Sequence, residues 1–291
     1  MPIPQSLEDT LEGRDAYQKL IRLFGPTLLF IGPSFTGESC VTTDFLREMR
    51  EADNCKIVAH HGESHIDRGQ SRFVDLVPLL DMLYTCSPTF IRAAQEQTGH
   101  DNIRLLLAAA DPALFYPVDV RRQIDLLFIG HRGGRQTDRN EVIYKLNEEF
   151  EDIWVAGNWW DKERLNHWRQ GIYTHDFSQW CSRAKIALCL VHEAHRTEMY
   201  FPSRLVNTMA TGAFALATYT PRLEQVFTRK VHLDWYNTYD ELVELIHYWL
   251  QHDEEREQVA RQGYEYVMNN HTATHRARQV LEDVGLLARV V

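Results

Sequence analysis

The chain has 291 residues, of which 44% are hydrophobic and 25% charged, a composition that suits a globular protein with a substantial core. Its formal charge is −10, from 41 acidic and 31 basic side chains, which argues against nucleic acid as a partner because phosphate binding calls for a basic surface. No apolar run reaches the roughly 20 residues that span a bilayer, and the polar start Met1–Arg14 does not have the pattern of a signal peptide. Five scattered cysteines without a CxxC pair favour a reducing compartment. We therefore expect a cytoplasmic protein.

The first part of the chain contains four short apolar runs that we predict to be strands. They are Thr27–Ile31, Lys56–Ala59, Met82–Thr85 and Ile103–Ala108. Amphipathic stretches with helical spacing lie between them, as at Thr43–Ala52 and Thr89–Thr98. The segment Asp111–Gln123, which contains two prolines, follows and predicts a domain break near residue 120.

The second part of the chain repeats this pattern. Its predicted strands are Asp125–Ile129, Ile153–Ala156, Ile186–Val191 and Ala213–Thr218. Helical stretches such as Arg139–Phe150 and Ser203–Ala210 separate them, and the tail Tyr239–Val291 is nearly all helical, with Gly263 as an interruption. Continuous apolar strands that alternate with helices indicate parallel sheets covered on both faces, so we predict a doubly wound α/β protein with two Rossmann-like domains.

A glycine-rich turn follows the first strand of the second part, within Asp125–Arg135. Glycines let the backbone approach a ligand closely, and Arg132 and Arg135 add charge that could neutralise a diphosphate. The spacing matches neither a dinucleotide-binding fingerprint nor a Walker loop. A tight turn with solvated arginines therefore remains an equal alternative.

The segment Phe201–Thr218 has the pattern of a helix followed by a small-residue strand. Pro202 suits a first helical turn, and Ser203, Arg204 and Asn207 lie at the start of the helix. These side chains are placed to face a ligand at the carboxyl edge of the sheet. By pattern alone, the segment is one ordinary αβ unit.

Several segments resemble, in the right order, the motifs of one family. They are Asn102–Pro117, Asp125–Gly130 with the downstream Arg139, Val155–Trp160, Cys181–Leu190, Arg204–Ala213, Leu242–Leu250, Glu255–Gly263 and His271–Arg276. Arg204–Ala213 is similar to the donor-binding signature of GT-B glycosyltransferases, and the whole set resembles the spore-maturation (CgeB-like) family. The resemblance implies an α/β GT-B fold, in which two Rossmann-like doubly wound domains face a cleft.

The resemblance also implies a domain plan. Residues 1–120 would form the acceptor-side domain, residues 121–272 the domain that binds the nucleotide-sugar donor, and residues 273–291 a helix that crosses back to the first domain. The first domain is shorter than in relatives, so we expect it to be abbreviated. Its acceptor site would then be reduced or completed by a partner subunit, which leaves a homo-oligomer open.

Roles for donor-binding residues follow from the same resemblance. Arg204 would contact the diphosphate, with Ser203 beside it at the helix start, and Arg132 is a second phosphate candidate together with Arg135. Backbone N–H groups near Gly212 and Ala213 could also bind the diphosphate.

Two further positions concern the base and the ribose. Tyr173 lies where such proteins usually hold the base. Many relatives place a glutamate at the position of Asn207 to hold the ribose hydroxyls, and an amide lacks a charge-assisted acceptor. Glu198 is a candidate to compensate, although a solvated surface carboxylate is the simpler interpretation.

A histidine-rich loop follows the second predicted strand, at Ala59–Asp67. His61, Glu63, His65 and Asp67 are all suitable types for a base that deprotonates an attacking hydroxyl. A merely polar loop is the alternative. We predict no metal site, because the segment lacks the HExxH pattern and the expected loop would not align two ligands.

Together these features predict a metal-independent glycosyltransferase that moves a sugar from a nucleotide-diphosphate sugar to a saccharide, glycan or other hydroxyl acceptor. The nucleotide sugar is a co-substrate, and no cofactor is expected. Two alternatives are a catalytically inactive nucleotide-sugar-binding or scaffold protein of GT-B shape, motivated by Asn207 and the short first domain, and a nucleotide-sugar epimerase. The sugar, the base and the stereochemical outcome stay open.

Overall fold

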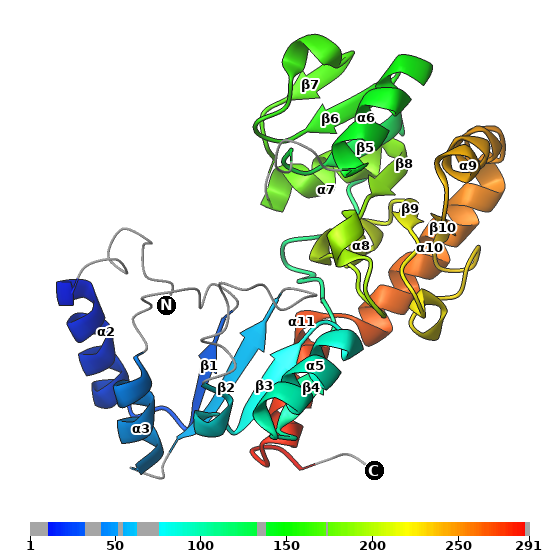
Figure 1. The fold of residues 1–291 in the computed structure, drawn as a ribbon. Coiled ribbons are helices and arrows are strands. Elements are labelled where there is room, and N and C mark those ends of the chain that lie inside the picture. The colour runs from blue at the N-terminus through cyan, green and yellow to red at the C-terminus, as the bar shows by residue number, and fades with distance from the viewer. Residues whose placement is uncertain are drawn as a thin grey trace. The chain divides into compact units, whose positions relative to one another are not determined.

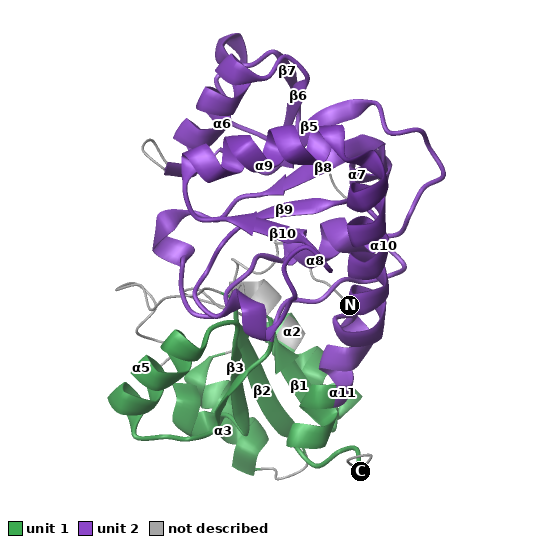
Figure 2. Ribbon diagram, turned by 90° about the vertical axis from the view of Figure 1, so that its right-hand side faces the viewer, with its two compact units in different colours: residues 1–106, 279–291 green, residues 107–278 purple. Residues whose placement is uncertain are grey.

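Two parallel β-sheets organise the chain, as seen in a computed structural model (Figure 1). The structure describes residues 11–32, 42–51, 55–62, 76–132, 138–172 and 174–288. The chain divides into two compact units, one made of Met1–Leu106 with Gln279–Val291 and the other of Leu107–Arg278 (Figure 2). Each unit holds one sheet and is described by itself.

The first unit contains a four-stranded parallel sheet with the order β1-β2-β3-β4. Its strands are β1 (Leu28–Ile31), β2 (Lys56–His61), β3 (Met82–Thr85) and β4 (Ile103–Leu105). Its helices are α2 (Leu11–Phe24), α3 (Thr43–Glu51), the short η2 (Val77–Leu79) and α5 (Pro88–Thr98). The four strands predicted from the sequence are confirmed, although β4 ends three residues earlier than expected because Leu107 and Ala108 pack into the core of the second unit.

Both faces of this first sheet are covered. Apolar residues of α3 and α5, among them Phe45 and Phe90, pack on one face. On the other face Val280 of α11 (Ala273–Asp283) packs on Val58 and Tyr84. The part of α11 that belongs to this unit is also held by polar contacts, since Gln279 donates to the Leu105 carbonyl at 2.8 Å. Apolar residues on successive strand positions thus face opposite covering layers, as expected for parallel strands.

The second unit contains a six-stranded parallel sheet with the order β10-β9-β8-β5-β6-β7. Its strands are β5 (Ile124–Ile129), β6 (Ile153–Ala156), β7 (His167–Arg169), β8 (Ala184–Cys189), β9 (Ala215–Thr218) and β10 (Asp234–Tyr236). Its α-helices are α6 (Asp138–Glu149), α7 (Thr174–Arg183), α8 (Ser203–Ala210), α9 (Tyr239–Gln251), α10 (Asp253–Asn270) and the start of α11. Three short helices complete the unit, namely η3 (Lys162–Arg164), η4 (Glu193–His195) and η5 (Leu223–Gln225).

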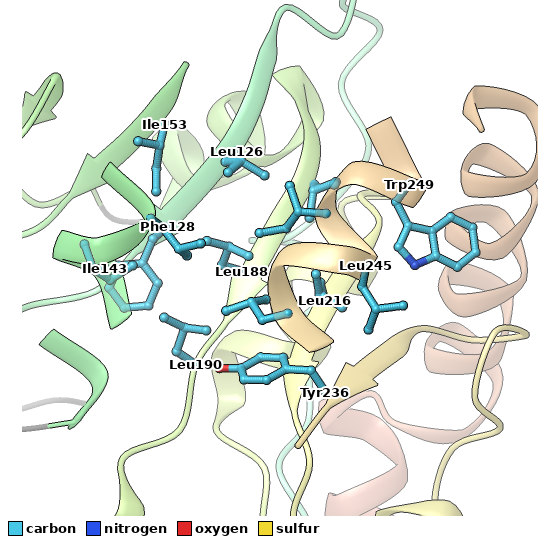
Figure 3. Packing of buried hydrophobic residues seen from close by; sticks show 14 of the residues in the cluster. Leu126, Phe128, Ile143, Ile153, Leu188, Leu190, Leu216, Tyr236, Leu245 and Trp249 are labelled. Atoms are coloured by element: carbon cyan, nitrogen blue, oxygen red, sulfur yellow. The ribbon is translucent and has the colours of Figure 1, made fainter. Parts of the chain in front are cut away.

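The second sheet is wound in both directions from its centre. Numbered from β5 in chain order, its strands run 3-2-1-4-5-6 from β7 to β10, which is the order of the doubly wound nucleotide-binding fold. Helices α6 and α9 pack on one face of the sheet, and α7 and α8 pack on the other. The first of these layers forms the core drawn in Figure 3, where Phe128, Leu188 and Trp249 are buried together. The predicted α/β fold is therefore confirmed in this unit.

Gly263 lies inside α10 and does not interrupt it, contrary to the expectation from the sequence. The helix keeps this glycine because it packs against another backbone segment: a Cβ at position 263 would collide with the carbonyl oxygen of His232 and lie 3.2 Å from the Met209 side chain. The glycine marks a close approach of two main chains rather than a helix end.

Replacing Gly263 by alanine should therefore destabilise the protein, although alanine is the better helix former. We expect the free energy of unfolding to fall by about 2 kcal/mol, because a backbone oxygen has to move to admit the methyl group. Urea unfolding measures this change. Arg261→Ala, at an exposed position of the same helix, is the matched control and should stay within about 0.5 kcal/mol of the native protein. An equally stable Gly263→Ala protein would contradict the close packing.

A buried histidine should make the second unit sensitive to acid. Arg276 donates from Nη2 to Nδ1 of His271 at 2.6 Å, and the ring of His271 is stacked on Phe227. Burial, together with the positive charge of Arg276, lowers the pKa of His271 to about 4. The unfolded chain, with a histidine pKa of about 6.5, therefore binds a proton that the folded protein does not bind between these two pH values.

The contribution of His271 to the free energy of unfolding is thus fully present above about pH 6.5. It is lost as the pH falls towards 4. We expect a loss of up to about 3 kcal/mol over this window, measured by denaturant unfolding at several pH values. His271→Gln keeps an acceptor for Arg276 but does not titrate, so its stability should depend less steeply on pH. Parallel pH profiles for the variant and the native protein would refute this origin.

Within the residues that the structure describes, no helix combines the length and apolar character needed to cross a membrane.

Candidate anion site of the second unit

The switch point of the second sheet lies between β5 and β8, from which the chain winds in opposite directions. In open α/β sheets, ligands bind outside the carboxyl ends of the strands at this point. The residues that follow β5 here are Gly130–Arg132, and those that follow β8 start at Leu190. The sheet order alone therefore indicates where a ligand would bind.

Arg204, in the first turn of α8, reaches this switch point. Its Nη1 donates to the Ile129 carbonyl at 2.7 Å and its Nη2 to the Leu190 carbonyl at 3.4 Å. Its guanidinium carbon lies 4.8 Å from the centre of the Phe128 ring. The last carbonyls of two neighbouring strands thus fix the guanidinium, and its desolvation lowers the pKa of Arg204.

Arg139, in the first turn of α6, brings a second positive charge to the same place. It donates from Nη2 to the His131 carbonyl at 2.7 Å, and its guanidinium carbon lies 5.8 Å from the centre of the Phe128 ring. Burial, with a further contribution from the charge of Arg204, lowers the pKa of Arg139 to about 10. The charge of Arg204 thus disfavours the charge of Arg139, and neither guanidinium is hydrogen-bonded to a carboxylate of the described residues.

Several arginines near this edge of the sheet have a buried N–H donor without an acceptor among the described residues. In the part of the chain that the structure describes, the buried Nε groups of Arg139 and Arg204 have no hydrogen-bond partner, and the same holds for Arg132 and Arg196 in the segments that follow β5 and β8. Arg196 follows β8 and lies 3.8 Å from Glu193, too far for a hydrogen bond. Buried N–H groups are normally paired, and guanidinium donors are suited to phosphate oxygens. Within the described residues, these guanidinium groups therefore have more N–H donors than acceptors, which is the property that a candidate anion site needs.

The structure places three more predicted donor residues near this edge. Ser203 is exposed at the first position of α8, and Asn207 lies one turn after Arg204. The side-chain oxygen of Asn207 is buried and has no hydrogen-bond partner in the described part of the chain. Glu198, in the segment between β8 and α8, forms an ion pair with Arg222 and is only 11% exposed. Its carboxylate is therefore already engaged by a cation.

Gly212 and Ala213 lie elsewhere, because α8 carries the chain away from the switch point. They precede β9 at the amino edge of the sheet. The N–H of Gly212 donates to Met209 at 3.0 Å and its carbonyl accepts from Arg122 at 2.8 Å, while Ala213 is buried in the core. Gly212 has a φ of +69°, a left-handed conformation that glycine adopts without steric cost. The structure thus does not bring these two residues together with Arg204, contrary to the expectation that their N–H groups share the diphosphate.

Of the four catalytic candidates in the first unit, the structure describes only His61. Its side chain is 3% exposed and its ring packs on Phe90 with centroids 4.5 Å apart. The neighbouring His60 points to the other face of the sheet, and burial lowers its pKa to about 4, so it is neutral at pH 7. Glu63, His65 and Asp67 lie outside the described residues, as do Arg135 and Tyr173 of the donor site. Among the residues described, no group of three or more potential ligands is arranged to hold a metal ion.

Sequence reasoning missed Arg196 and gave Arg139 no binding role. In the sequence, Arg139 is only part of a motif that resembles the family. It lies 65 residues before Arg204, so the sequence does not show that both guanidinium groups lie near Phe128. The available signal was the placement of arginines in the first residues after strands and at helix starts, which meet at one edge of a parallel sheet.

The sheet order defines the second unit as a Rossmann-like domain, with buried arginines at its switch point. A family model described as glycosyl transferase-like matches residues 135–282, slightly more than half of the chain. The chain therefore belongs to this glycosyl transferase-like family. No curated protein sequence gives a significant match.

Solved structures with the same fold cover nearly the whole chain. Anabaena HepE in complex with UDP and glucose is similar with a TM-score of 0.68 at 10% identity, over 95% of this chain and 82% of that one. Sucrose-phosphate synthase from Thermosynechococcus elongatus has a TM-score of 0.66 at 14% identity, over 96% and 79%. A glycosyltransferase from Rickettsia africae has a TM-score of 0.64 at 11% identity, over 98% and 83%. These similarities confirm the GT-B type of α/β fold.

Proposed function

We propose that the protein is a glycosyltransferase that transfers a sugar from a nucleoside-diphosphate sugar to a hydroxyl acceptor. The observation that carries the proposal is the pair Arg139 and Arg204 at the switch point, whose buried Nε donors find no acceptor among the residues that the structure describes. Membership of the glycosyl transferase-like family and the UDP-bound structure of Anabaena HepE support the same substrate class.

The chemistry that this site supports is stabilisation of a leaving diphosphate. In the transfer, the bond between the sugar carbon and the β-phosphate oxygen breaks, the acceptor oxygen bonds to that carbon, and its proton passes to a base or to the leaving phosphate. Negative charge therefore develops on the diphosphate as the reaction proceeds. Preorganised guanidinium groups stabilise this charge without reorganisation, so Arg139, Arg204 and Arg132 can fulfil this role without a metal ion.

Other residues receive narrower roles in this proposal. Asn207 would hydrogen-bond a ribose or sugar hydroxyl with its unpaired side-chain oxygen. His61 is not proposed as the base, because its ring is covered by Phe90. Glu63, His65 and Asp67, and Arg135 and Tyr173 at the donor, stay predictions from the sequence, as does the closer relation to the spore-maturation family.

A transfer and hydrolysis assay against a panel of nucleotide sugars tests the proposal. We expect saturable release of nucleoside diphosphate from at least one donor, accelerated by its acceptor. Saturable nucleotide binding without turnover of any donor would instead identify an inactive nucleotide-sugar-binding protein. Formation of an isomeric nucleotide sugar without an acceptor would identify an epimerase.

A further inference from the structure

An exposed tryptophan with a left-handed backbone lies just after β6. The Trp159 side chain is 73% exposed, and its φ is +65°. Large aromatic side chains are usually buried, and residues with a Cβ rarely adopt positive φ. Among the described residues of the second unit, Trp159 is the one exposed aromatic side chain. The positive φ costs free energy, and backbone outliers of this kind collect at functional sites.

The neighbouring tryptophan shows that the fold does not need Trp159 for its core. Trp160 is 5% exposed, its Nε1 donates to the Gly130 carbonyl at 2.8 Å, and its ring packs edge-on against Phe128 and Tyr144. The core requirement for an indole at this turn is thus met by Trp160. Trp159 is left with no comparable packing role.

The turn that carries Trp159 is held firmly by the turns on both sides. The N–H of Asn158 donates to Nδ1 of His131 at 3.0 Å, and its carbonyl accepts from the N–H of Arg132 at 3.1 Å. Its side-chain oxygen accepts from the N–H of Gly171, after β7, at 3.3 Å. The indole of Trp159 also contacts the His131 ring, with centroids 5.2 Å apart. The ring is therefore presented to solvent from a fixed backbone.

The exposed ring is connected to the anion site through one residue. The carbonyl of His131 accepts the hydrogen bond from Arg139, while its imidazole contacts Trp159. Because β6 is the direct neighbour of β5, the turn with Trp159 lies about 5 Å along the sheet edge from the turn after β5. A nucleoside diphosphate is extended, with a ribose between phosphate and base. Its base would therefore lie one or two strands away from the arginines.

In the other direction along the sheet, none of the described Phe, Tyr or Trp rings is exposed. Towards β9 and β10, the aromatic residues Trp235 and Tyr236 are 7% and 3% exposed, so neither presents a free ring. We propose that Trp159 is the stacking surface for the nucleobase of the donor, an assignment that rests on the proposed nucleoside-diphosphate-sugar function. Base-on-indole stacking requires only a flat ring, so it adds affinity for any base rather than selecting one.

Calorimetric titration of the full chain with UDP, GDP, ADP and inorganic pyrophosphate tests the assignment. Trp159→Ala should lower the affinity for the tightest-binding nucleotide by about tenfold, the usual range for loss of one stacked base. The affinity for pyrophosphate should not change. Trp159→Phe retains a ring and should stay within about threefold of the native affinity. Trp159→Gly also removes the ring but suits the positive φ, so it should bind as weakly as Trp159→Ala while unfolding at a higher temperature.

A control variant distinguishes a stacking role of Trp159 from a general effect of removing an exposed ring. Different outcomes also distinguish failure of the stacking role from failure of the proposed function. Phe24→Ala removes another exposed aromatic ring, 83% exposed in the first unit, and should leave every affinity unchanged. Native affinity of Trp159→Ala for nucleoside diphosphates would overturn the stacking role and leave the proposed function standing. A loss for the nucleotide sugar but not for the nucleoside diphosphate would place the sugar, not the base, on the ring and overturn it too. If the native protein binds pyrophosphate but no nucleotide, both proposals fail together.

Discussion

Arg204→Ala is expected to weaken nucleoside diphosphate binding by about 100-fold while leaving the affinity for the bare nucleoside within about twofold. The guanidinium is held at the switch point by the carbonyls of Ile129 and Leu190, and its Nε is free to donate to a phosphate oxygen. Because charge builds up on the diphosphate during transfer, kcat/KM should fall further, by roughly 1,000-fold. Calorimetry and steady-state kinetics give the two numbers.

Arg204→Lys should lie between alanine and the native protein. A lysine keeps the charge but loses the planar fork that contacts two carbonyls and leaves Nε for the proposed phosphate contact. Equal losses for nucleoside and nucleoside diphosphate would refute the phosphate role of Arg204.

The matched control is an arginine that also binds backbone carbonyls, but at the opposite edge of the same sheet. Arg122 donates to the carbonyls of Ala184 and Gly212 at 2.9 and 2.8 Å and pairs with Glu257 at 2.5 Å. Arg122→Ala should therefore lower the stability without changing the nucleotide dissociation constant. A similar drop in affinity for both variants would show that Arg204→Ala acts through the fold rather than through the ligand.

Most of the second sheet could be predicted from the sequence because its central strands are continuous apolar runs. Two edge strands could not: β7 has the sequence His-Trp-Arg and β10 begins at Asp234, so neither shows an apolar run. Each is three residues long and is recognised only by its pairing with a neighbour. The order of the strands, and with it the switch point, depends on these pairings.

The sequence indicates the candidate site through residues that follow a strand or begin a helix. Arg132 follows β5 and Arg204 lies in the first turn of α8, and the structure holds the Arg204 guanidinium at the switch point. For Gly212–Ala213 the expectation failed for a geometric reason: α8 has eight residues and advances the chain by about 12 Å, from the carboxyl edge to the amino edge of the sheet. Alternation along β2 separates His60 from His61, but only the tertiary packing of Phe90 shows which ring is covered.

Two glycines that follow the neighbouring strands β5 and β6 should respond differently to the same substitution. A Cβ on Gly157 would collide with the carbonyl oxygen of Gly130, which is backbone and also accepts from Trp160. A Cβ on Gly130 would instead collide with Nη1 of Arg204 and lie 2.9 Å from the Phe128 ring. The first clash can be relieved only by moving main chain. The second can be relieved by moving two side chains, the end of Arg204 and, by a few tenths of an ångström, the ring of Phe128.

Gly157→Ala is therefore expected to lower the free energy of unfolding by about 3 kcal/mol, as measured by urea denaturation. Gly130→Ala should cost only about 1 kcal/mol of stability but weaken nucleoside diphosphate binding by about 30-fold, because the guanidinium of Arg204 is displaced. Equal effects of the two substitutions on stability would contradict this difference between backbone and side-chain clashes.

A double-mutant cycle decides whether Gly130 acts through Arg204. If the methyl group harms binding only by displacing the guanidinium, Gly130→Ala should have no further effect on affinity once Arg204 is alanine. If instead the turn itself binds the phosphates through its backbone, the two losses should add, because each substitution then removes an independent contact. The structure favours the first outcome, because the Gly130 N–H already donates to the Ala156 carbonyl at 2.8 Å and its carbonyl accepts from Trp160. Both backbone polar groups of Gly130 are thus hydrogen-bonded inside the protein. Gly130 matters because it has no Cβ, which leaves room for the positively charged guanidinium of Arg204.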